Sequence, residues 1–215
     1  MKTLIRSLII CLTIVSMGNF AKGQTTYKEA RKQLKDKAIK DARKEAKKWR
    51  KKGFSNLPGD APLDKQFEES MVLQYMKDEN GKPLYISAFG TAIAGSEGVA
   101  SANALDNARL GLAGQVQAEV SALISNNKAN SQYSTKDVET IDEFISNSKT
   151  LIQKELGAVK PMIRMYREFD GKVEYRYSLM YDLKEARKVT KKIIKEQLQE
   201  KLDENEKDLD KLLGL

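Results

Sequence analysis

The 215-residue chain carries 38 Lys and Arg against 30 Asp and Glu, a net charge of +8, and it contains no histidine and one cysteine. This composition excludes a Ser-His-Asp or Cys-His catalytic centre and any metal site built from several His or Cys ligands. Carboxylate, Ser-Lys and tyrosine chemistry remain open to the chain.

The first 23 residues have the pattern of a secretory signal peptide. Lys2 and Arg6 form a positive n-region, and Leu8 to Met17 form a ten-residue apolar stretch. Ala21-Lys22-Gly23 then places small residues at both positions that signal peptidase reads. We therefore expect an exported protein whose mature chain begins at Gln24. An uncleaved membrane anchor is the weaker alternative, because ten apolar residues cover about half of the hydrocarbon core of a bilayer.

The single cysteine, Cys11, lies inside the apolar stretch. Ile10 precedes it, where a bacterial lipidation site requires a small residue. We interpret Cys11 as part of the signal, so the mature chain has no cysteine and needs no disulfide.

Residues 27–52 form a basic segment with thirteen Lys and Arg against four Asp and Glu, while the chain after it sums to −4. The segment has no Gly or Pro and is dominated by strong helix formers, so it predicts one continuous helix. Small and apolar side chains recur every three or four residues as a narrow stripe: Ala30, Leu34, Ala38, Ala42, Ala46 and Trp49. Gly53 followed by Phe54 predicts a left-handed C-cap. We expect residues 24–58 to be a basic helix and linker.

This basic helix is open to three interpretations. Nucleic acid would suit its charge, but an exported protein seldom meets nucleic acid, and no interleaved aromatic residues offer stacking platforms. An anionic lipid or polysaccharide surface of the cell envelope would attract the helix electrostatically. A solvated helix that packs its alanine stripe on the rest of the protein, with Trp49 as an anchor, is the structural interpretation. The candidate surface-binding residues are the last lysines of the segment: Lys44, Lys47, Lys48, Lys51 and Lys52.

After a loop with Pro58, Gly59 and Pro62, the pattern predicts a helix over residues 63–77 and a turn over 79–82. Residues 85–93 alternate as a strand. One predicted face of the strand carries Tyr85, Ser87, Phe89 and Thr91, and the other is nearly flat, with Ile86, Ala88, Gly90 and Ala92.

A long helix is predicted over residues 99–125, with a core-facing stripe made of Ala104, Ala108, Leu112, Val116, Val120 and Leu123. Gly111 and Gly114 interrupt this helix, and each costs about 1 kcal/mol of helix stability relative to Ala. We therefore expect both glycines to permit close packing against the flat face of the preceding strand.

The glycines between strand and helix have the spacing of a phosphate-binding loop. Such a loop requires a lysine and then Ser or Thr after its second glycine. Here Ser96-Glu97 follow Gly95, and Glu97 would place a carboxylate where phosphate belongs. The spacing of Gly90, Gly95 and Gly98 does not fit a dinucleotide-binding loop either. We interpret these glycines as turn and close-packing residues and expect no nucleotide cofactor.

Residues 126–133 form a polar loop, and Ser134 with Asp137 predicts a capping box that begins a helix to about Leu156. Asp170-Gly171 then predicts a two-residue hairpin turn.

Pairing outward from that turn predicts the register of the hairpin: Phe169 opposite Lys172, Arg167 opposite Glu174, Tyr166 opposite Tyr175, and Met162 opposite Leu179. One face carries the Arg167–Glu174 pair, and the other is an apolar face built from Val173, Tyr175, Tyr177, Leu179 and Tyr181. Arg164 falls on the apolar face opposite Tyr177, where we expect its long side chain to reach the edge of the sheet.

From about Lys184 a last helix is predicted, with Ala186, Val189, Ile193 and Ile194 towards the body. Leucines and one Asn then continue at spacings of four and three, typical of a coiled coil, for about two heptads: Leu198, Leu202, Asn205, Leu209 and Leu212. We expect residues 59–195 to be one α+β domain and residues 196–215 to be a C-terminal helical extension.

No spacing in the chain singles out a catalytic pair. The S-x-x-K matches Ser125/Lys128 and Ser146/Lys149 lack the S-D-N and K-T-G motifs that accompany Ser-Lys acylases, and lysine is frequent enough to produce them by chance. The carboxylates are numerous, and none is marked by its spacing as an acid or a base.

Two stretches carry a resemblance to a known family: "ASANALDNARLGLAGQVQAEV" from Ala100 and "KPMIRMYREFDGKVEYRYSLMYDL" from Lys160. Together they resemble the domain of the twenty-kilodalton bacterial outer-membrane lipoproteins, which is related to the N-terminal domain of flagellar assembly protein T. The family pattern A-x-x-x-A-R-x-x-L-A falls on Ala104, Ala108, Arg109, Leu112 and Ala113. The resemblance spans roughly residues 84–195 and implies an envelope accessory module without catalytic residues. The chain departs from the family in lacking a lipidation cysteine.

We therefore expect an α+β fold in which a small antiparallel sheet, of three strands with one hairpin, packs on long helices with N- and C-terminal helical extensions. The expected function is that of an exported, non-enzymatic cell-envelope accessory protein that binds envelope partners or self-associates through helix faces. It would lie in the periplasm or at the outer-membrane periphery of a Gram-negative bacterium, with no cofactor, no metal, no nucleic acid and no transmembrane span after processing. The alternative is a carboxylate-dependent periplasmic hydrolase, which a cleft holding two carboxylates of raised pKa would favour.

Overall fold

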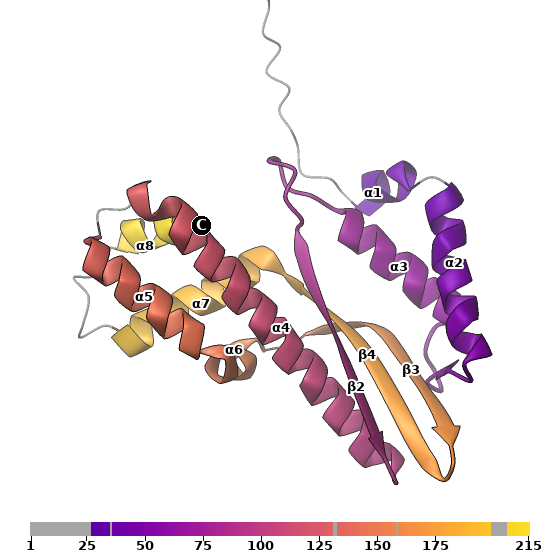
Figure 1. Cartoon of the computed structure of the whole chain (residues 1–215). Helices are drawn as coiled ribbons and strands as arrows, with labels where there is room; N and C mark the ends of the chain where they lie inside the picture. Colours follow the sequence, from indigo (N-terminus) through magenta and orange to yellow (C-terminus); the bar gives the residue numbers. More distant parts are fainter. Residues whose placement is uncertain (1–26, 35, 131–132, 158, 199–205) are drawn as a thin grey trace, which may run out of the picture.

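The computed structural model describes residues 27–34, 36–130, 133–157, 159–198 and 206–215. The predicted signal peptide lies outside these residues, as do Leu202 and Asn205. The described chain is α+β, as predicted (Figure 1). Its helices are α1 (Tyr27–Gln33), α2 (Asp36–Lys51), α3 (Leu63–Tyr75), α4 (Glu97–Asn127), the short 3₁₀ helix η1 (Lys128–Asn130), α5 (Thr135–Asn147), α6 (Lys149–Glu155), α7 (Leu183–Leu198) and α8 (Glu206–Leu213). Its strands are β1 (Ser55–Asn56), β2 (Tyr85–Ala94), β3 (Lys160–Phe169) and β4 (Lys172–Asp182).

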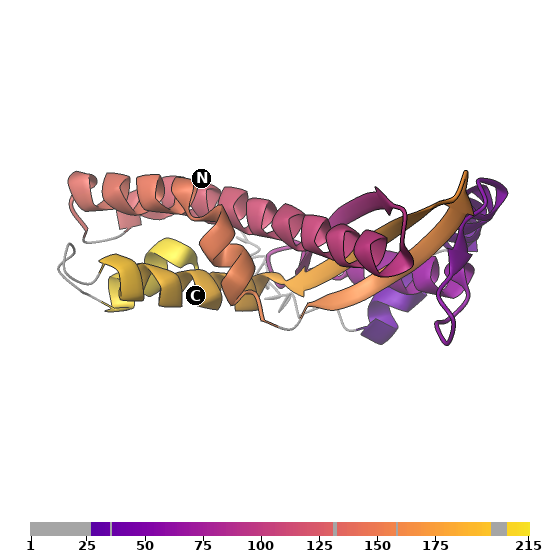
Figure 2. The same ribbon diagram turned by 90° about the horizontal axis from the view of Figure 1, so that it is seen from below.

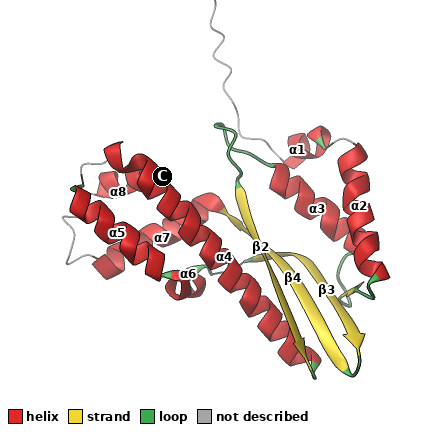
Figure 3. Cartoon of the chain, in the orientation of Figure 1, coloured by secondary structure: helices red, strands yellow, loops and turns green. Residues whose placement is uncertain are grey.

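The strands form one antiparallel sheet in the order β1-β3-β4-β2 (Figure 3). The sequence predicted three of these strands, and the structure adds β1, whose two residues pair with Tyr166 and Met165 of β3. Two residues are too few to show an alternating pattern, so β1 could not be recognised from periodicity.

The flat face of β2 is where α4 packs. A Cβ atom on Gly90 would lie 2.1 Å from the carbonyl oxygen of Ala104 and 2.2 Å from the backbone nitrogen of Ala108, so the helix backbone occupies the space of a side chain. Gly111 also lies against the strand, because a Cβ atom there would lie 3.1 Å from the Cβ of Ala88. Glycine at positions 90 and 111 therefore serves close helix–strand packing, as predicted.

The predicted stripe of α4 is buried over its whole length. Beyond the sheet, the C-terminal half of α4 is flanked by α5, α6, α7 and α8, which gives the molecule its elongated shape (Figure 2). Gly114 belongs to this helical part: a Cβ atom there would lie 3.1 Å from Cε of Lys149 in α6. The prediction that Gly114 packs against the strand was wrong, because position 114 faces α6 and not the sheet.

The helix predicted from Ser134 to Leu156 is interrupted at Ser148, which ends α5 and precedes α6. The Ser148 hydroxyl donates to the carbonyl oxygen of Phe144 at 2.6 Å, a back-bond that is frequent where helices bend. The capping box at the start of α5 is confirmed: Asp137 N donates to Ser134 Oγ, and Ser134 N donates to an Asp137 carboxylate oxygen, both at 3.2 Å.

The hairpin of β3 and β4 has the predicted turn and register from Phe169–Lys172 to Arg164–Tyr177. Asp170 and Gly171 both have positive φ, 50° and 71°, as a two-residue hairpin turn of this type requires. Farther along, the register shifts between Pro161 and Ile163, so Pro161 and not Met162 lies opposite Leu179. The predicted Met162–Leu179 pair was wrong because a bulge inserts one residue into β3.

Arg164 lies opposite Tyr177 as predicted, and its guanidinium forms an ion pair with Asp60 in the loop before α3. Its backbone N–H donates to Oε1 of Gln66 at 2.7 Å. Arg164 therefore attaches the loop before α3 to the sheet. The sequence predicted that its long side chain would reach the edge of the sheet but did not predict these contacts.

The predicted continuous helix over residues 27–52 is two helices, α1 and α2. Ala30 and Leu34 are buried with Val72 of α3, whereas Ala46 and Trp49 pack in a second cluster with Phe54. A straight helix of 26 residues would be about 39 Å long, roughly twice the length of α3, which both halves cover. The change of direction lets both halves of the alanine stripe contact the body (Figure 1).

The C-cap of α2 is confirmed. Gly53 has φ of 85°. Gly53 N donates to the Arg50 carbonyl at 3.0 Å and Phe54 N to the Trp49 carbonyl at 3.1 Å. The rings of Trp49 and Phe54 meet edge to face at 5.3 Å, the hydrophobic contact that accompanies this cap.

Within the described residues, the predicted last helix and the helical extension after it correspond to α7 and α8. Ala186, Ile193 and Ile194 of α7 are buried as predicted. Leu209 and Leu212 of α8 are buried in the main core, where α8 packs on α4 and α7. These two leucines therefore cover the chain's own helices, which accounts for their spacing without a coiled-coil partner.

Candidate functional site

The candidate surface-binding lysines lie at the C-terminal end of α2 and just after it. Lys44, Lys47, Lys48, Lys51 and Lys52 are all exposed. Lys48 forms an ion pair with Glu45 at 3.3 Å, and Lys52 Nζ lies 4.6 Å from the ring centroid of Trp49. Among the described residues, Lys44, Lys47 and Lys51 form no ion pair. The structure therefore keeps all five amines at the surface of one helix end.

The arginines of α2 have a different role from its lysines. Arg43 forms an ion pair with Glu68, and Arg50 NH1 lies 3.1 Å from Oδ1 of Asp64, both carboxylates belonging to α3. Burial alone would raise the pKa of Glu68, but hydrogen bonds from Arg43 and Lys65 outweigh it and hold that pKa below its ordinary value. The arginines thus attach α2 to the body, which leaves its lysines facing solvent.

A cluster of arginines and aromatic rings joins the end of α2 to the sheet. Glu174 of β4 is almost fully buried, and it accepts from Arg167 Nε at 2.8 Å and from Arg176 Nε at 2.9 Å. Burial favours a higher pKa for Glu174, but the two arginines hold the pKa below its ordinary value. Arg176 also lies 4.7 Å from the Trp49 ring centroid, and Arg167 lies 4.9 Å from that of Phe54. Two guanidinium groups therefore share one carboxylate, and the cluster keeps an excess positive charge.

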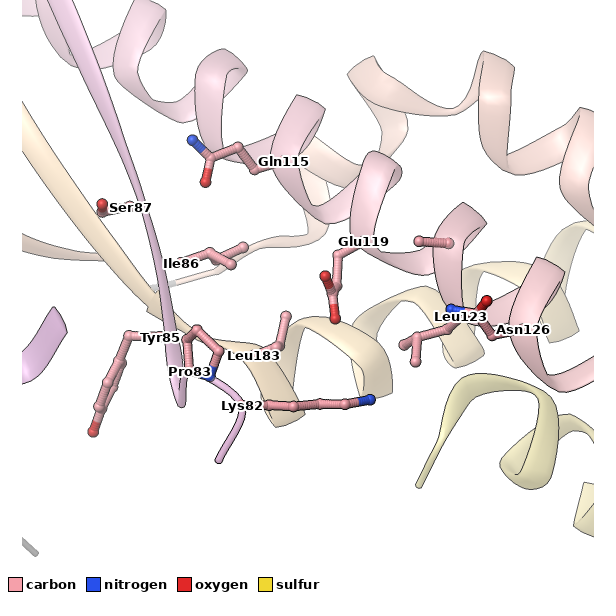
Figure 4. A pocket seen from close by; sticks show the side chains of 11 residues that line it. Lys82, Pro83, Tyr85, Ile86, Ser87, Gln115, Glu119, Leu123, Asn126 and Leu183 are labelled. Carbon is pink, nitrogen blue, oxygen red and sulfur yellow. The ribbon is translucent and has the colours of Figure 1, made fainter. Parts of the chain in front are cut away.

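A groove of about 520 Å³ lies between the start of β2 and the C-terminal half of α4 (Figure 4). Its apolar lining comes from Ile86, Leu123 and Leu183, and its polar lining includes Lys82 and Glu119. Glu119 extends from α4 toward the start of α7 in Figure 4. It accepts a hydrogen bond from Arg187 of α7 at 3.3 Å, so its charge helps to hold α7 against α4.

The hydrolase alternative requires a cleft with two carboxylates whose pKa values are raised. Glu139 and Asp142 line a cavity of about 340 Å³, and Asp182 and Glu185 line one of about 330 Å³. Asp182 accepts from the backbone N–H groups of Lys184 and Glu185, so it caps the start of α7. In the described part of the chain, the carboxylates with a displaced pKa are Asp64, Glu68 and Glu174, and all three pKa values are lowered by arginine or lysine partners.

The tyrosines on the α4 side of the sheet form a stack in which Tyr175 lies between Tyr166 and Tyr177. Its ring centroid is 5.6 Å from that of Tyr166 and 6.1 Å from that of Tyr177. The Tyr175 hydroxyl donates to Glu97, and Tyr177 and Ser101 share a hydrogen bond of 2.9 Å. Burial, and then the hydrogen bond to Glu97, raise the pKa of Tyr175 well above its ordinary value. A phenol held protonated in this way supports packing rather than nucleophilic chemistry.

The other sequence candidates lie at the surface. Ser125 and Lys128 line the cavity beside α5, and Ser146 and Lys149 are exposed at the junction of α5 and α6. In the parts of the chain that the structure places, no group of three or more His, Cys, Asp or Glu residues is arranged to hold a metal ion. Within the same residues, no helix combines the length and the apolar character that crossing a membrane requires.

Comparison with known proteins gives no relative: no protein-family model, no curated protein and no solved structure matches this chain.

Proposed function

We propose that the protein is an exported, non-enzymatic accessory protein of the bacterial cell envelope that binds an anionic surface through the end of α2. The observation that carries this proposal is the division of charge on α2. Its arginines are bound to α3, whereas Lys44, Lys47 and Lys51 are exposed without ion pairs among the described residues. Basic residues near an anionic membrane contribute about 1 kcal/mol each, so five amines at one helix end are enough for reversible binding.

The non-enzymatic part of the proposal is supported by how the chain uses its carboxylates. Asp64, Glu68 and Glu174 have lowered pKa values and join helices or strands through ion pairs. General acid chemistry near neutral pH needs a carboxyl group whose pKa is raised instead. The resemblance to the twenty-kilodalton outer-membrane lipoproteins points in the same direction, toward an envelope module at the outer-membrane periphery.

The surface-binding proposal is tested by cosedimentation with vesicles made of equal parts of phosphatidylglycerol and phosphatidylcholine. We expect binding that falls steeply between about 0.1 M and about 1 M salt, because the Debye length falls from about 10 Å to about 3 Å. Changing Lys44, Lys47, Lys48, Lys51 and Lys52 together to Gln should weaken binding at low salt, with helix propensity nearly unchanged.

The matched control changes five exposed lysines scattered over other elements to Gln: Lys77, Lys136, Lys154, Lys160 and Lys184. This control has the same net charge as the α2 variant. If both variants lose binding equally, attraction depends on net charge and α2 has no special role. Absence of wild-type binding at low salt, both to these vesicles and to immobilised heparin as an anionic polysaccharide, would refute the surface-binding proposal.

Export is tested separately by N-terminal sequencing of the mature protein recovered from cells. A start at Gln24 supports the proposal. A start at Met1 or Thr3 would refute it.

A further inference from the structure

The sheet face on which α2 and α3 pack is not covered over its full width. Phe89 and Ile93 of β2 are 62% and 53% exposed. They lie two residues to either side of Thr91, and side chains on a strand alternate, so all three share one face. Thr91 pairs with Arg176 and Ile93 with Glu174, so this is the face that carries the arginine cluster.

The exposed apolar residues adjoin the cationic end of α2. Arg176, the cross-strand neighbour of Thr91, lies 4.7 Å from the Trp49 ring centroid, and Lys52 lies 4.6 Å from the same ring. We call Phe89, Ile93, Arg176, Trp49 and Lys52 the amphipathic surface. Arg176 and Trp49 link its apolar side chains on β2 to Lys52 at the end of α2.

We propose that the amphipathic surface docks on the interface of an anionic lipid bilayer, with Phe89 and Ile93 inserted among the lipids. This inference rests on the proposed function and narrows its anionic surface from lipid or polysaccharide to lipid. A polysaccharide satisfies the cations alone, whereas a bilayer interface also provides an apolar phase beside anionic headgroups.

Two further features fit a bilayer. The ten residues of β2 carry no charged side chain, so bringing this strand to the interface moves no charge out of water. Trp49 is a half-buried indole between Lys52 and Arg176, and tryptophan is favoured at the boundary between headgroups and acyl chains.

The test compares the wild type with the double variant Phe89→Ser/Ile93→Thr, on the same vesicles, in the full chain recovered after export. All variants share one N-terminus, so any contribution of that segment cancels. Removing two half-exposed apolar side chains should lower the affinity for vesicles about tenfold. Because no charge changes, the slope of log affinity against log salt should stay the same. The α2 lysine variant should flatten that slope, which separates the two contributions.

The matched control is Tyr75→Ser/Leu105→Thr, which removes an aromatic and an aliphatic side chain that are 40% and 38% exposed elsewhere. It should bind vesicles as the wild type does. Retention on immobilised heparin, an anionic polysaccharide, should be the same for the wild type and for the Phe89/Ile93 variant.

Vesicle affinity of the Phe89/Ile93 variant within about twofold of the wild type would overturn the lipid inference. If the α2 lysine variant is still impaired in that case, the proposed function stands. Equal losses on heparin and on vesicles would also overturn the inference, because the substitutions would then act without an apolar phase. If the wild type binds neither the vesicles nor heparin at low salt, the proposed function itself is refuted.

Discussion

The two faces of the sheet are covered by helices in different ways. On one face, α4 lies against alanine and glycine, and at Gly90 the helix backbone occupies the place of a side chain. On the other face, α2 and α3 are held through large side chains: methionines, Trp49, Phe54 and arginines that share Glu174. The first face is close-packed around Ala88 and Gly90 of β2, whereas the second leaves Phe89 and Ile93 of the same strand exposed. The features that suggest binding lie on the face whose covering is incomplete.

The largest expected effect tests the close-packed face. Gly90→Val places a side chain in the backbone of α4, and neither element can move without opening the core. We expect a loss of at least about 4 kcal/mol in the free energy of unfolding, measured by urea denaturation followed by circular dichroism. Gly98→Val is the control, because a Cβ atom there meets nothing within 4 Å. A loss of less than about 1 kcal/mol for Gly90→Val would show that α4 is not held as closely as described.

A smaller effect is expected on the opposite face. Phe54 is 2% exposed and fills the cluster between Trp49 and the sheet, so Phe54→Ala should cost about 3 kcal/mol of unfolding free energy. Phe89→Ala also removes a phenyl ring on this side of the sheet. Because Phe89 is 62% exposed, its loss should lower the free energy of unfolding by less than about 1 kcal/mol. If Phe54→Ala and Phe89→Ala lower the stability equally in thermal or urea unfolding, Phe89 is covered in solution and the sheet face is not open there.

The smallest expected effect on stability concerns Glu174, whose carboxylate Arg167 and Arg176 share. Glu174→Gln removes charge-assisted hydrogen bonds to two arginines and should cost about 2 kcal/mol at neutral pH. The folded protein lowers the pKa of Glu174, so its stabilisation is present above the ordinary carboxyl range. This stabilisation is lost as the pH falls from about 4.3, the ordinary pKa of a glutamate, through the lower pKa of Glu174 in the folded protein.

Unfolding measured at a series of pH values should therefore show a weaker acid destabilisation in Glu174→Gln than in the wild type. The exposed Glu168→Gln is the control and should follow the wild type. Identical acid profiles for the wild type and Glu174→Gln would contradict the ion-pair account of this cluster.

Local signals in the sequence predicted much of the fold. The Asp170-Gly171 turn led to the correct pairs Arg167–Glu174 and Tyr166–Tyr175, because a two-residue turn determines the register next to it. Ser134 and Asp137 predicted the start of α5, and the small residues of β2 predicted the close approach of α4. Each of these depends on residues near one another in sequence or on one alternating face.

The failures have tertiary causes. The break between α1 and α2 is set by the length of α3, and the bulge at Met162 shifts a register that the turn alone cannot determine. The sequence placed Phe89 with Tyr85, Ser87 and Thr91 on one face, but the exposure of that face depends on where α2 and α3 end. The five lysines were recognised as a group, whereas their junction with Trp49 and Arg176 required the fold.

The central claim is that the end of α2 and the adjoining sheet face lie on an anionic bilayer. Trp49 is the only tryptophan of the chain, and it lies between Lys52 and Arg176, so its fluorescence reports on this surface alone. The direct measurement is the quenching of that fluorescence by vesicles of phosphatidylglycerol and phosphatidylcholine whose acyl chains carry bromine. The account predicts quenching at low salt that is reversed at about 1 M salt. Protein that sediments with these vesicles while Trp49 stays unquenched would contradict it, because binding would then use another surface.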